Sequence, residues 1–172
     1  MQRALCFLAL LSLIATGCAR HGNKVPPIHG TAPDFRLDTL SHQRFYLNAY
    51  RGNVVVLIFW MTTCQPCKKE MVEFKPVAEE LAPRGVTVVS VCTDPENLDA
   101  ARRVVESLDI PFPTLLDRDG LVARKYGVRA LPTTVIIDRN GKLSLWRAGY
   151  DDLIARQLRA HLESMTTQGG SG

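Results

Sequence analysis

The chain has 172 residues, of which 46% are hydrophobic and 22% are charged, close to the averages of soluble globular proteins. This length favours one domain with one ordinary core. The formal net charge of +4 comes from 21 basic and 17 acidic residues scattered along the chain, which argues against a nucleic-acid partner.

The first residues have the pattern of an export signal. Arg3 gives a positive start, and residues 4–15 form an apolar run that is interrupted only by Ser12. This run is shorter than the roughly 20 residues that a membrane-spanning helix needs. Its end, from Ala15 to Cys18, resembles a bacterial lipoprotein cleavage site, although leucine is usual where Ala15 stands. We therefore expect residues 1–17 to be a signal peptide and Cys18 to carry a lipid, with ordinary cleavage or an uncleaved anchor as alternatives.

The composition after the signal divides the rest of the chain. Residues 18–32 are rich in Gly, Pro, Asn and His without an apolar period, which predicts a flexible tether. Residues 33–165 are expected to form the folded domain. Residues 166–172, rich in Thr, Gln, Gly and Ser, are expected to be a disordered tail.

The apolar patterns of the domain predict an α/β fold with a mixed central sheet. Continuous apolar runs indicate buried strands, three- and four-residue spacing indicates helices, and an Asn-Gly step indicates a tight hairpin. In chain order, the predicted elements are a hairpin at 34–37 and 44–47, a strand at 54–60, a helix at 66–81, a strand at 86–92, a helix at about 95–108, a strand at 114–116, a helical turn at 121–126, a hairpin at 134–138 and 142–146, and a helix at 151–164. The predicted helices cover both faces of the sheet, and the first hairpin lies at the N-terminus.

Cys64 and Cys67 are separated by two residues and stand where the first buried strand gives way to a helix. A sulfur at the start of a helix faces free backbone N–H groups and the positive end of the helix dipole. Both favour the thiolate, and cysteines in such motifs have pKa values of roughly 3.5 to 7 rather than about 8.5. We therefore expect Cys64 to attack a partner's disulfide and the more buried Cys67 to resolve the mixed disulfide.

Other uses of the cysteines fit the sequence less well. Haem attachment requires a histidine where Lys68 stands, and a zinc site would have to use Cys92 and two remote histidines, His42 and His161. A metal site and a purely structural bridge are kept as alternatives to redox exchange. Export leaves three cysteines in the domain, so at least one has no internal partner. Cys92 ends a buried strand, and we interpret it either as an apolar filler or as an extra reactive thiol.

Three motifs occur in a specific order along the chain. Residues 54–70 end in C-x-x-C-K-K-E, residues 112–117 read FPTLLD, and residues 126–138 read YGVRALPTTVIID. Together they resemble the extracytoplasmic thioredoxin-like thiol-disulfide oxidoreductases, the group around the membrane-tethered reductants of cytochrome c maturation. The resemblance covers about residues 32–163 and implies a thioredoxin-like fold.

The resemblance also implies a substrate-binding surface. In the family, the residue pair corresponding to Leu131 and Pro132 forms a cis peptide beside the cysteines, and its backbone binds the partner's extended chain. Trp60, at the end of the strand before the cysteines, is expected to contribute to this surface. Without the resemblance, Pro132 also fits a plain proline at the start of a strand, and Trp60 a core residue.

Glu70, three residues after Cys67, resembles the glutamate that the cytochrome-maturation reductants use for proton control. Thioredoxins proper instead have a buried aspartate at the position of Ile58. A partly buried carboxylate near two sulfurs has a raised pKa and can exchange protons with Cys67. The alternative is a solvated helix glutamate, because Glu73 and Glu79 lie on the same predicted helix.

The sequence therefore predicts a thiol-disulfide oxidoreductase that is anchored to a membrane on its extracytoplasmic, periplasmic side and uses no cofactor or metal. Through Cys64 and Cys67 it would reduce disulfides of exported proteins such as apocytochrome c, with electrons from a membrane thiol donor. A thiol peroxidase is an alternative, but Leu57 and Met61 stand where peroxiredoxins need proline and threonine. A copper-binding module is a second alternative, although the cysteine spacing and the position of His161 fit such a module poorly.

Overall fold

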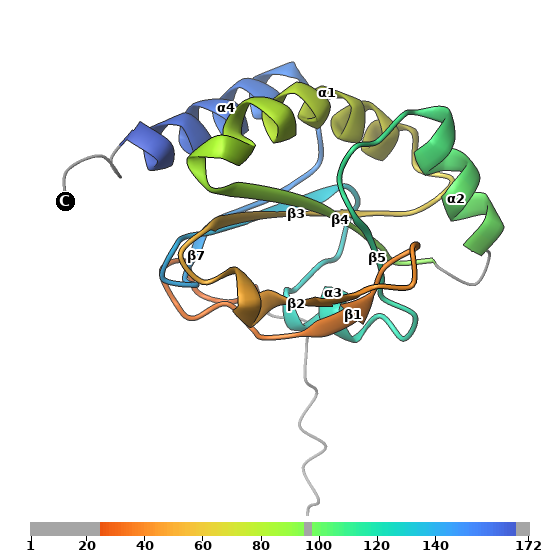
Figure 1. Cartoon of the computed structure of the whole chain (residues 1–172), viewed down its shortest axis with the longest axis horizontal. Helices are drawn as coiled ribbons and strands as arrows, with labels where there is room; N and C mark the ends of the chain where they lie inside the picture. Colours follow the sequence, from red (N-terminus) through yellow and green to blue (C-terminus); the bar gives the residue numbers. More distant parts are fainter. Residues whose placement is uncertain (1–24, 95–97, 168–172) are drawn as a thin grey trace, which may run out of the picture.

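The structure, a computed structural model, describes residues 25–94 and 98–167 of the chain (Figure 1). The predicted signal peptide, Cys18 and the first part of the predicted tether lie outside the described residues, as do residues 168–172 of the predicted tail. In the part of the chain that the structure describes, no helix is both long and apolar enough to cross a membrane.

The centre of the described domain is a five-stranded mixed sheet with the strand order β5-β4-β3-β6-β7. The strands are β3 (Val54–Trp60), β4 (Val86–Cys92), β5 (Thr114–Leu116), β6 (Thr133–Ile137) and β7 (Leu143–Ala148). β3 pairs in parallel with β4 and antiparallel with β6, so it is the middle strand. All of its residues are buried, which explains their unbroken run of apolar side chains.

In the described residues, helices cover one face of the sheet, and a strand pair with a short helix covers the other (Figure 1). The first layer holds α1 (Gln65–Leu81), α2 (Leu98–Ser107) and α4 (Asp152–Thr167); the second holds β1 (Arg36–Asp38), β2 (Arg44–Tyr46) and α3 (Leu121–Lys125). Short 3-10 helices, η1 (Leu47–Tyr50) and η2 (Ala82–Arg84), follow β2 and α1. The predicted mixed sheet, with helices on both faces and an N-terminal hairpin, is therefore confirmed.

Alternate residues of β3 pack against the two layers. Ile58 and Trp60 contact the cluster under α1, whereas Leu57 and Phe59 contact the cluster under the strand pair and α3. This alternation is the normal consequence of strand geometry, in which successive side chains point to opposite faces. The strand thereby fixes the direction in which the chain leaves the sheet at Trp60 and enters the cysteine motif.

Packed structure extends beyond the predicted domain bounds at both ends. Residues 29–32, predicted as tether, pair with the start of β7 and the turn before it: His29 N donates to Leu143 O at 2.6 Å and Ala32 N donates to Gly141 O at 3.0 Å. Ala32 is buried, so the packed domain begins before residue 33. At the other end, α4 continues to Thr167 and takes up the first residues of the predicted tail.

Candidate redox site

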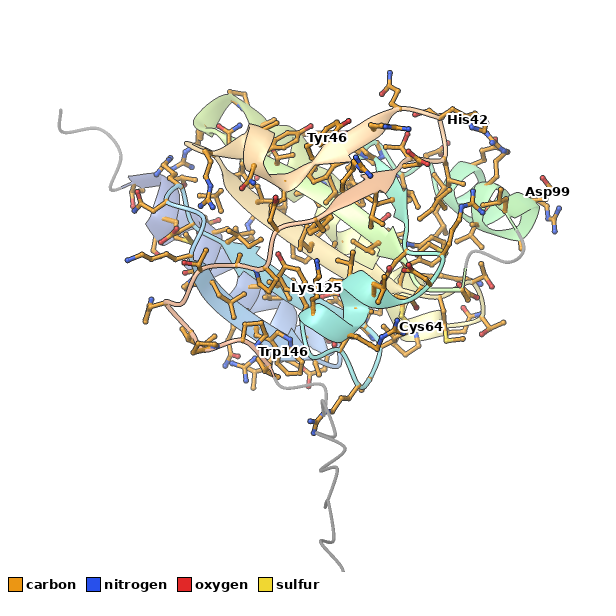
Figure 2. The ribbon with its side chains drawn as sticks, turned by 90° about the horizontal axis from the view of Figure 1, so that it is seen from below. His42, Tyr46, Cys64, Asp99, Lys125 and Trp146 are labelled. Carbon is orange, nitrogen blue, oxygen red and sulfur yellow. A yellow bond between two sulfur atoms is a disulfide. The ribbon has the colours of Figure 1, made fainter. Side chains whose placement is uncertain are left out.

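The two cysteines of the motif form a disulfide at the start of α1. Their sulfur atoms are 2.00 Å apart, and Cys64 is the residue that caps the N-terminus of the helix. Cys64 is half-buried, whereas Cys67 has no exposed area. Figure 2 shows Cys64 near the rim of the molecule, on the side opposite to Tyr46. One sulfur is thus within reach of another chain and the other is covered.

The helix start provides the electrostatic environment that the sequence predicted. The backbone N–H of Cys67 donates to the Cys64 sulfur at 3.2 Å, and the first turn of α1 carries no acidic side chain. Pro66 lies in this turn, where its missing N–H removes no helix hydrogen bond. A hydrogen bond to the sulfur and the positive end of the helix dipole both favour negative charge on Cys64 after the disulfide is reduced.

Asp94 holds the loop that leads into the cysteines. Both of its carboxylate oxygens accept from Thr62 N at 3.0 Å, and Oδ2 also accepts from Thr62 Oγ1 at 2.7 Å. Sequence reasoning did not single out Asp94 or Thr62. The available signal was an acidic residue two positions after the end of β4, because the carboxyl ends of the parallel strands β3 and β4 meet at the same edge of the sheet.

Cys92, at the end of β4, is fully buried and not part of a disulfide. Its thiol donates to Asp94 Oδ1 at 3.3 Å. Burial raises the pKa of Cys92 to about 12, which keeps the thiol protonated at neutral pH. These properties favour the interpretation as an unreactive core residue over the extra reactive thiol.

Glu70 lies on the inner face of α1 with no exposed area. Its Oε1 accepts a hydrogen bond from Thr134 Oγ1 at 2.6 Å, whereas its Oε2 is buried without a hydrogen-bond partner. Burial raises the pKa of Glu70 to about 7, and the hydrogen bond from Thr134 opposes this effect. The alternative of a solvated helix glutamate is therefore wrong. Thr134, on the neighbouring strand β6, was not recognised as a partner from the sequence.

The peptide bond between Leu131 and Pro132 is cis, as the family resemblance implied. It directly precedes β6, which pairs with β3, so this bond lies at the edge of the sheet where β3 ends and the cysteine motif follows. Pro132 is buried and Leu131 is half-buried. Pro132 O accepts from Gly149 N at 2.8 Å, which ties the segment after β7 to the same edge.

Trp60 does not lie on the predicted substrate-binding surface. Its side chain is 0% exposed and belongs to the core cluster that also contains Cys67 and Met71. A ring without exposed area cannot contact another chain, so the prediction of a substrate-binding role for Trp60 is wrong for this conformation. The core interpretation of this aromatic residue is the one that the structure bears out.

The described residues contain no group of three or more His, Cys, Asp or Glu side chains that could hold a metal ion. His161, the histidine considered for a copper site, lies on α4, where its Nε2 contacts Ser144 Oγ at 2.8 Å. Of the residues predicted for the site, the structure brings Cys64, Cys67, Glu70 and the Leu131-Pro132 bond to one region.

A disulfide at a helix start beside a cis-proline segment, on a sheet of this topology, defines a thioredoxin-like thiol-disulfide oxidoreductase. The profile of the AhpC/TSA family matches residues 28–145, and the chain belongs to this family. It is 35% identical over 167 residues to the thiol-disulfide oxidoreductase ResA of Geobacillus thermodenitrificans, with 92% of each chain covered. A second ResA, of Geobacillus kaustophilus, is 35% identical over 142 residues, which cover 80% of this chain and 78% of that protein.

Solved structures agree with this assignment. A putative thiol:disulfide interchange protein DsbE from Chlorobium tepidum matches with a TM-score of 0.78 and 28% identity, over 83% of this chain and 99% of that one. A secreted disulfide oxidoreductase of Mycobacterium tuberculosis, described as homologous to DsbE, matches with a TM-score of 0.66 and 25% identity, over 76% and 95% of the two chains. The protein is a thiol-disulfide oxidoreductase.

The burial of Glu70 predicts an unusual pH dependence of stability. Its pKa is about 7 in the folded protein and 4.5 when unperturbed. Between these values the folded state keeps a proton that the unfolded state has released, so the free energy of unfolding should fall as pH rises through this range. The total loss is about 3 kcal/mol, complete above the folded pKa. Urea unfolding of the disulfide form at several pH values should show this decline in the wild type and not in Glu70→Gln.

Glu79→Gln is the matched control, because Glu79 is an exposed glutamate of the same helix. This variant leaves Glu70 in place and should keep the wild-type decline. If Glu70→Gln and the wild type lost stability equally over the same pH range, the description of Glu70 as a buried group that keeps its proton would be wrong.

Proposed function

We propose that the protein reduces disulfides of exported proteins through Cys64 and Cys67. The observation that carries this proposal is the pairing of a half-exposed cysteine at the start of α1 with a fully buried one a turn later. Such a pair can hold a partner on one sulfur while the other remains protected from solvent and from other thiols.

In the proposed cycle the dithiol form is the electron donor. The Cys64 thiolate attacks one sulfur of the partner's disulfide, a Cys64–partner disulfide forms, and the partner's other sulfur leaves as a thiolate that takes up a proton. The Cys67 thiolate then attacks the Cys64 sulfur, which releases the partner's second thiol and forms the Cys64–Cys67 disulfide. Two electrons have passed to the partner, and the described disulfide form is the oxidised state.

Glu70 is proposed to accept the proton that Cys67 loses in the second step. It lies three residues after Cys67 on α1, a spacing that places two side chains on the same helix face about 5–6 Å apart between Cβ atoms. Its pKa of about 7 suits proton exchange at neutral pH. Its unpaired Oε2 leaves one oxygen available for this proton.

Leu131 and Pro132 are proposed to bind the partner's chain next to the disulfide. Leu131 is half-buried and lies outside the β6 ladder, so its backbone can pair with an extended segment. Backbone pairing gives affinity without requiring a particular sequence, which suits an enzyme with several substrates. Trp60 is not part of this proposed surface, because it is buried.

We propose exported proteins as the substrates, with apocytochrome c among them, and a membrane thiol donor as the source of electrons. The export signal predicted for residues 1–17 and the similarity to ResA and DsbE proteins support this choice. The same signal, with Cys18 as the lipid acceptor, supports an extracytoplasmic protein anchored to a membrane.

The peroxidase alternative has weak support in the site. Leu57, at the position where peroxiredoxins have proline, is buried in β3, and Met61 offers no hydroxyl at the position of their threonine. The Met61 side chain therefore has no donor for a hydrogen bond to a bound peroxide. Disulfide exchange requires no such donor.

Trapping of the mixed disulfide tests the proposed roles of the cysteines. Reduced Cys67→Ser, mixed with insulin, should accumulate a covalent adduct through Cys64 that is visible on a non-reducing gel and located by mass spectrometry. Cys64→Ser should form no such adduct, and its insulin reduction should fall by about a hundredfold or more, because a serine hydroxyl does not ionise at neutral pH.

Cys92→Ala is the control for the loss of a cysteine, since Cys92 is buried and not part of the disulfide, and it should retain insulin reduction. Full insulin reductase activity in Cys64→Ser would refute the proposed function.

The lipid anchor is tested in the full chain. After expression in bacteria and detergent phase separation, the wild type should partition with the membrane lipids, and Cys18→Ala should move to the aqueous phase because it lacks the lipid acceptor. Cys6→Ala is the matched control, because Cys6 lies within the proposed signal peptide and is removed with it. Equal partitioning of the wild type and Cys18→Ala would contradict the anchor.

A further inference from the structure

Three buried polar atoms lack hydrogen-bond partners in the described residues. They are Oε2 of Glu70, the phenolic oxygen of Tyr150 and Nε1 of Trp60. A buried polar atom without a partner is unfavourable by about 1–3 kcal/mol, so such atoms are rare and their positions are informative. The Glu70 oxygen is a pure acceptor when ionised, whereas the phenol and the indole N–H can donate.

Tyr150 lies beside the site, in the segment between β7 and α4. The preceding residue, Gly149, donates its N–H to Pro132 O at 2.8 Å, which places this segment next to the cis-proline bond. On the other side, Lys69 Nζ lies 5.8 Å from the centre of the Tyr150 ring. Lys69 is the neighbour of Glu70 on α1, so the tyrosine lies between the cis-proline segment and the first turns of this helix.

Charges around the phenol keep it in the form that donates. Burial raises the pKa of Tyr150, and the carboxylates of Glu73, Glu70 and Asp152 raise it further. The effect of Glu70 on this pKa means that the two groups lie within electrostatic range of each other. Tyr150 is therefore a neutral O–H donor at neutral pH.

Other charged groups in this region are already engaged or lie at the surface. They are Lys69 and Glu73 on α1, Asp151 and Asp152 at the start of α4, Arg156 one turn later, and Arg147 on β7. Arg147 is exposed and lies opposite Thr134 in the strand register. Lys69 Nζ binds Asp152 Oδ1 at 2.9 Å, which directs this cation to α4. Besides the indole N–H of Trp60, the phenol of Tyr150 is thus the buried donor that has no partner in the described residues.

We propose that Tyr150 is a positioning residue for Glu70: its phenolic O–H donates to Glu70 Oε2, directly or through one bridging water, when this carboxyl ionises. Thr134 would then hold Oε1 and Tyr150 would hold Oε2. The carboxylate becomes fixed between β6 and the segment after β7, facing the turn of α1 that carries Cys67. This inference rests on the proposed role of Glu70 as the proton acceptor of the redox pair.

The hydrogen bond has a definite effect on protonation. A donor to the ionised carboxylate favours the charged form, so Tyr150 lowers the pKa of Glu70 relative to a site without the O–H. More of the Glu70 population is then ionised at neutral pH and ready to accept the proton of Cys67. Removal of the O–H should make the step in which Cys67 resolves the mixed disulfide require a higher pH.

The test is a Tyr150→Phe variant of the full chain with carbon-13 labelled glutamate. Carboxyl NMR titration of the reduced protein, with Glu70→Gln used to assign the signal, should show the Glu70 pKa raised by about one unit. The rate at which mixed disulfide is resolved should shift to higher pH by the same amount. Tyr46→Phe, a change at an exposed tyrosine that lies away from Cys64 in Figure 2, should leave both curves unchanged.

Comparison with Tyr150→Leu separates the effect of the O–H from the effect of the aromatic ring, because this variant removes both. If the O–H is the active group, Phe and Leu variants should both show the raised Glu70 pKa. If Tyr150→Phe retains the wild-type titration, the inference is overturned, whatever the Leu variant does. This result is distinguishable from failure of the proposed function, because the carboxyl titration does not depend on catalytic turnover and Cys64→Ser tests that function separately.

Discussion

The hydrogen bond from Cys67 N–H to the Cys64 sulfur, at the first turn of α1, is the interaction on which the site depends. It exists because β3 ends at Trp60 and the chain turns directly into a helix, so that Cys64 becomes the capping residue. Asp94 fixes the intervening loop through Thr62. The central strand, the loop and the helix start therefore act as one support that aims a single sulfur outward and buries the other.

Two opposing electrostatic effects set the balance between the dithiol and the disulfide. The helix start favours a thiolate on Cys64, which stabilises the dithiol form and by itself would make the pair a stronger oxidant. Glu70, buried one turn further along α1, opposes additional negative charge on Cys67 once it is ionised. Because the carboxyl is ionised only above a pKa of about 7, the pair and Glu70 are expected to titrate as a coupled group. This coupling favours electron donation and links it to proton transfer.

The sequence was most informative where one local pattern decides the structure. The strands at 54–60, 86–92 and 114–116 were correct to the residue, because short runs rich in apolar and β-branched residues and bounded by turns have few alternatives. Trp60 was placed on the wrong surface because sequence shows that it ends a strand but not that α1 covers it. Residues 29–32 look like a tether in composition, yet they find backbone partners on the turn before β7. Asp94, Thr134 and Tyr150 gain their importance from contacts between distant segments, which single-sequence patterns do not report.

The reduction potential of the Cys64–Cys67 pair is the most direct test of this account. Equilibration of the purified protein with glutathione buffers, followed by thiol alkylation and mass spectrometry, gives the fraction of dithiol at each ratio. A reductant should have a potential nearer to the roughly −270 mV of thioredoxin than to the roughly −120 mV of a strong oxidant such as DsbA. A value near the latter would reverse the proposed direction of electron flow, and a disulfide that never equilibrates would show that the bridge is structural.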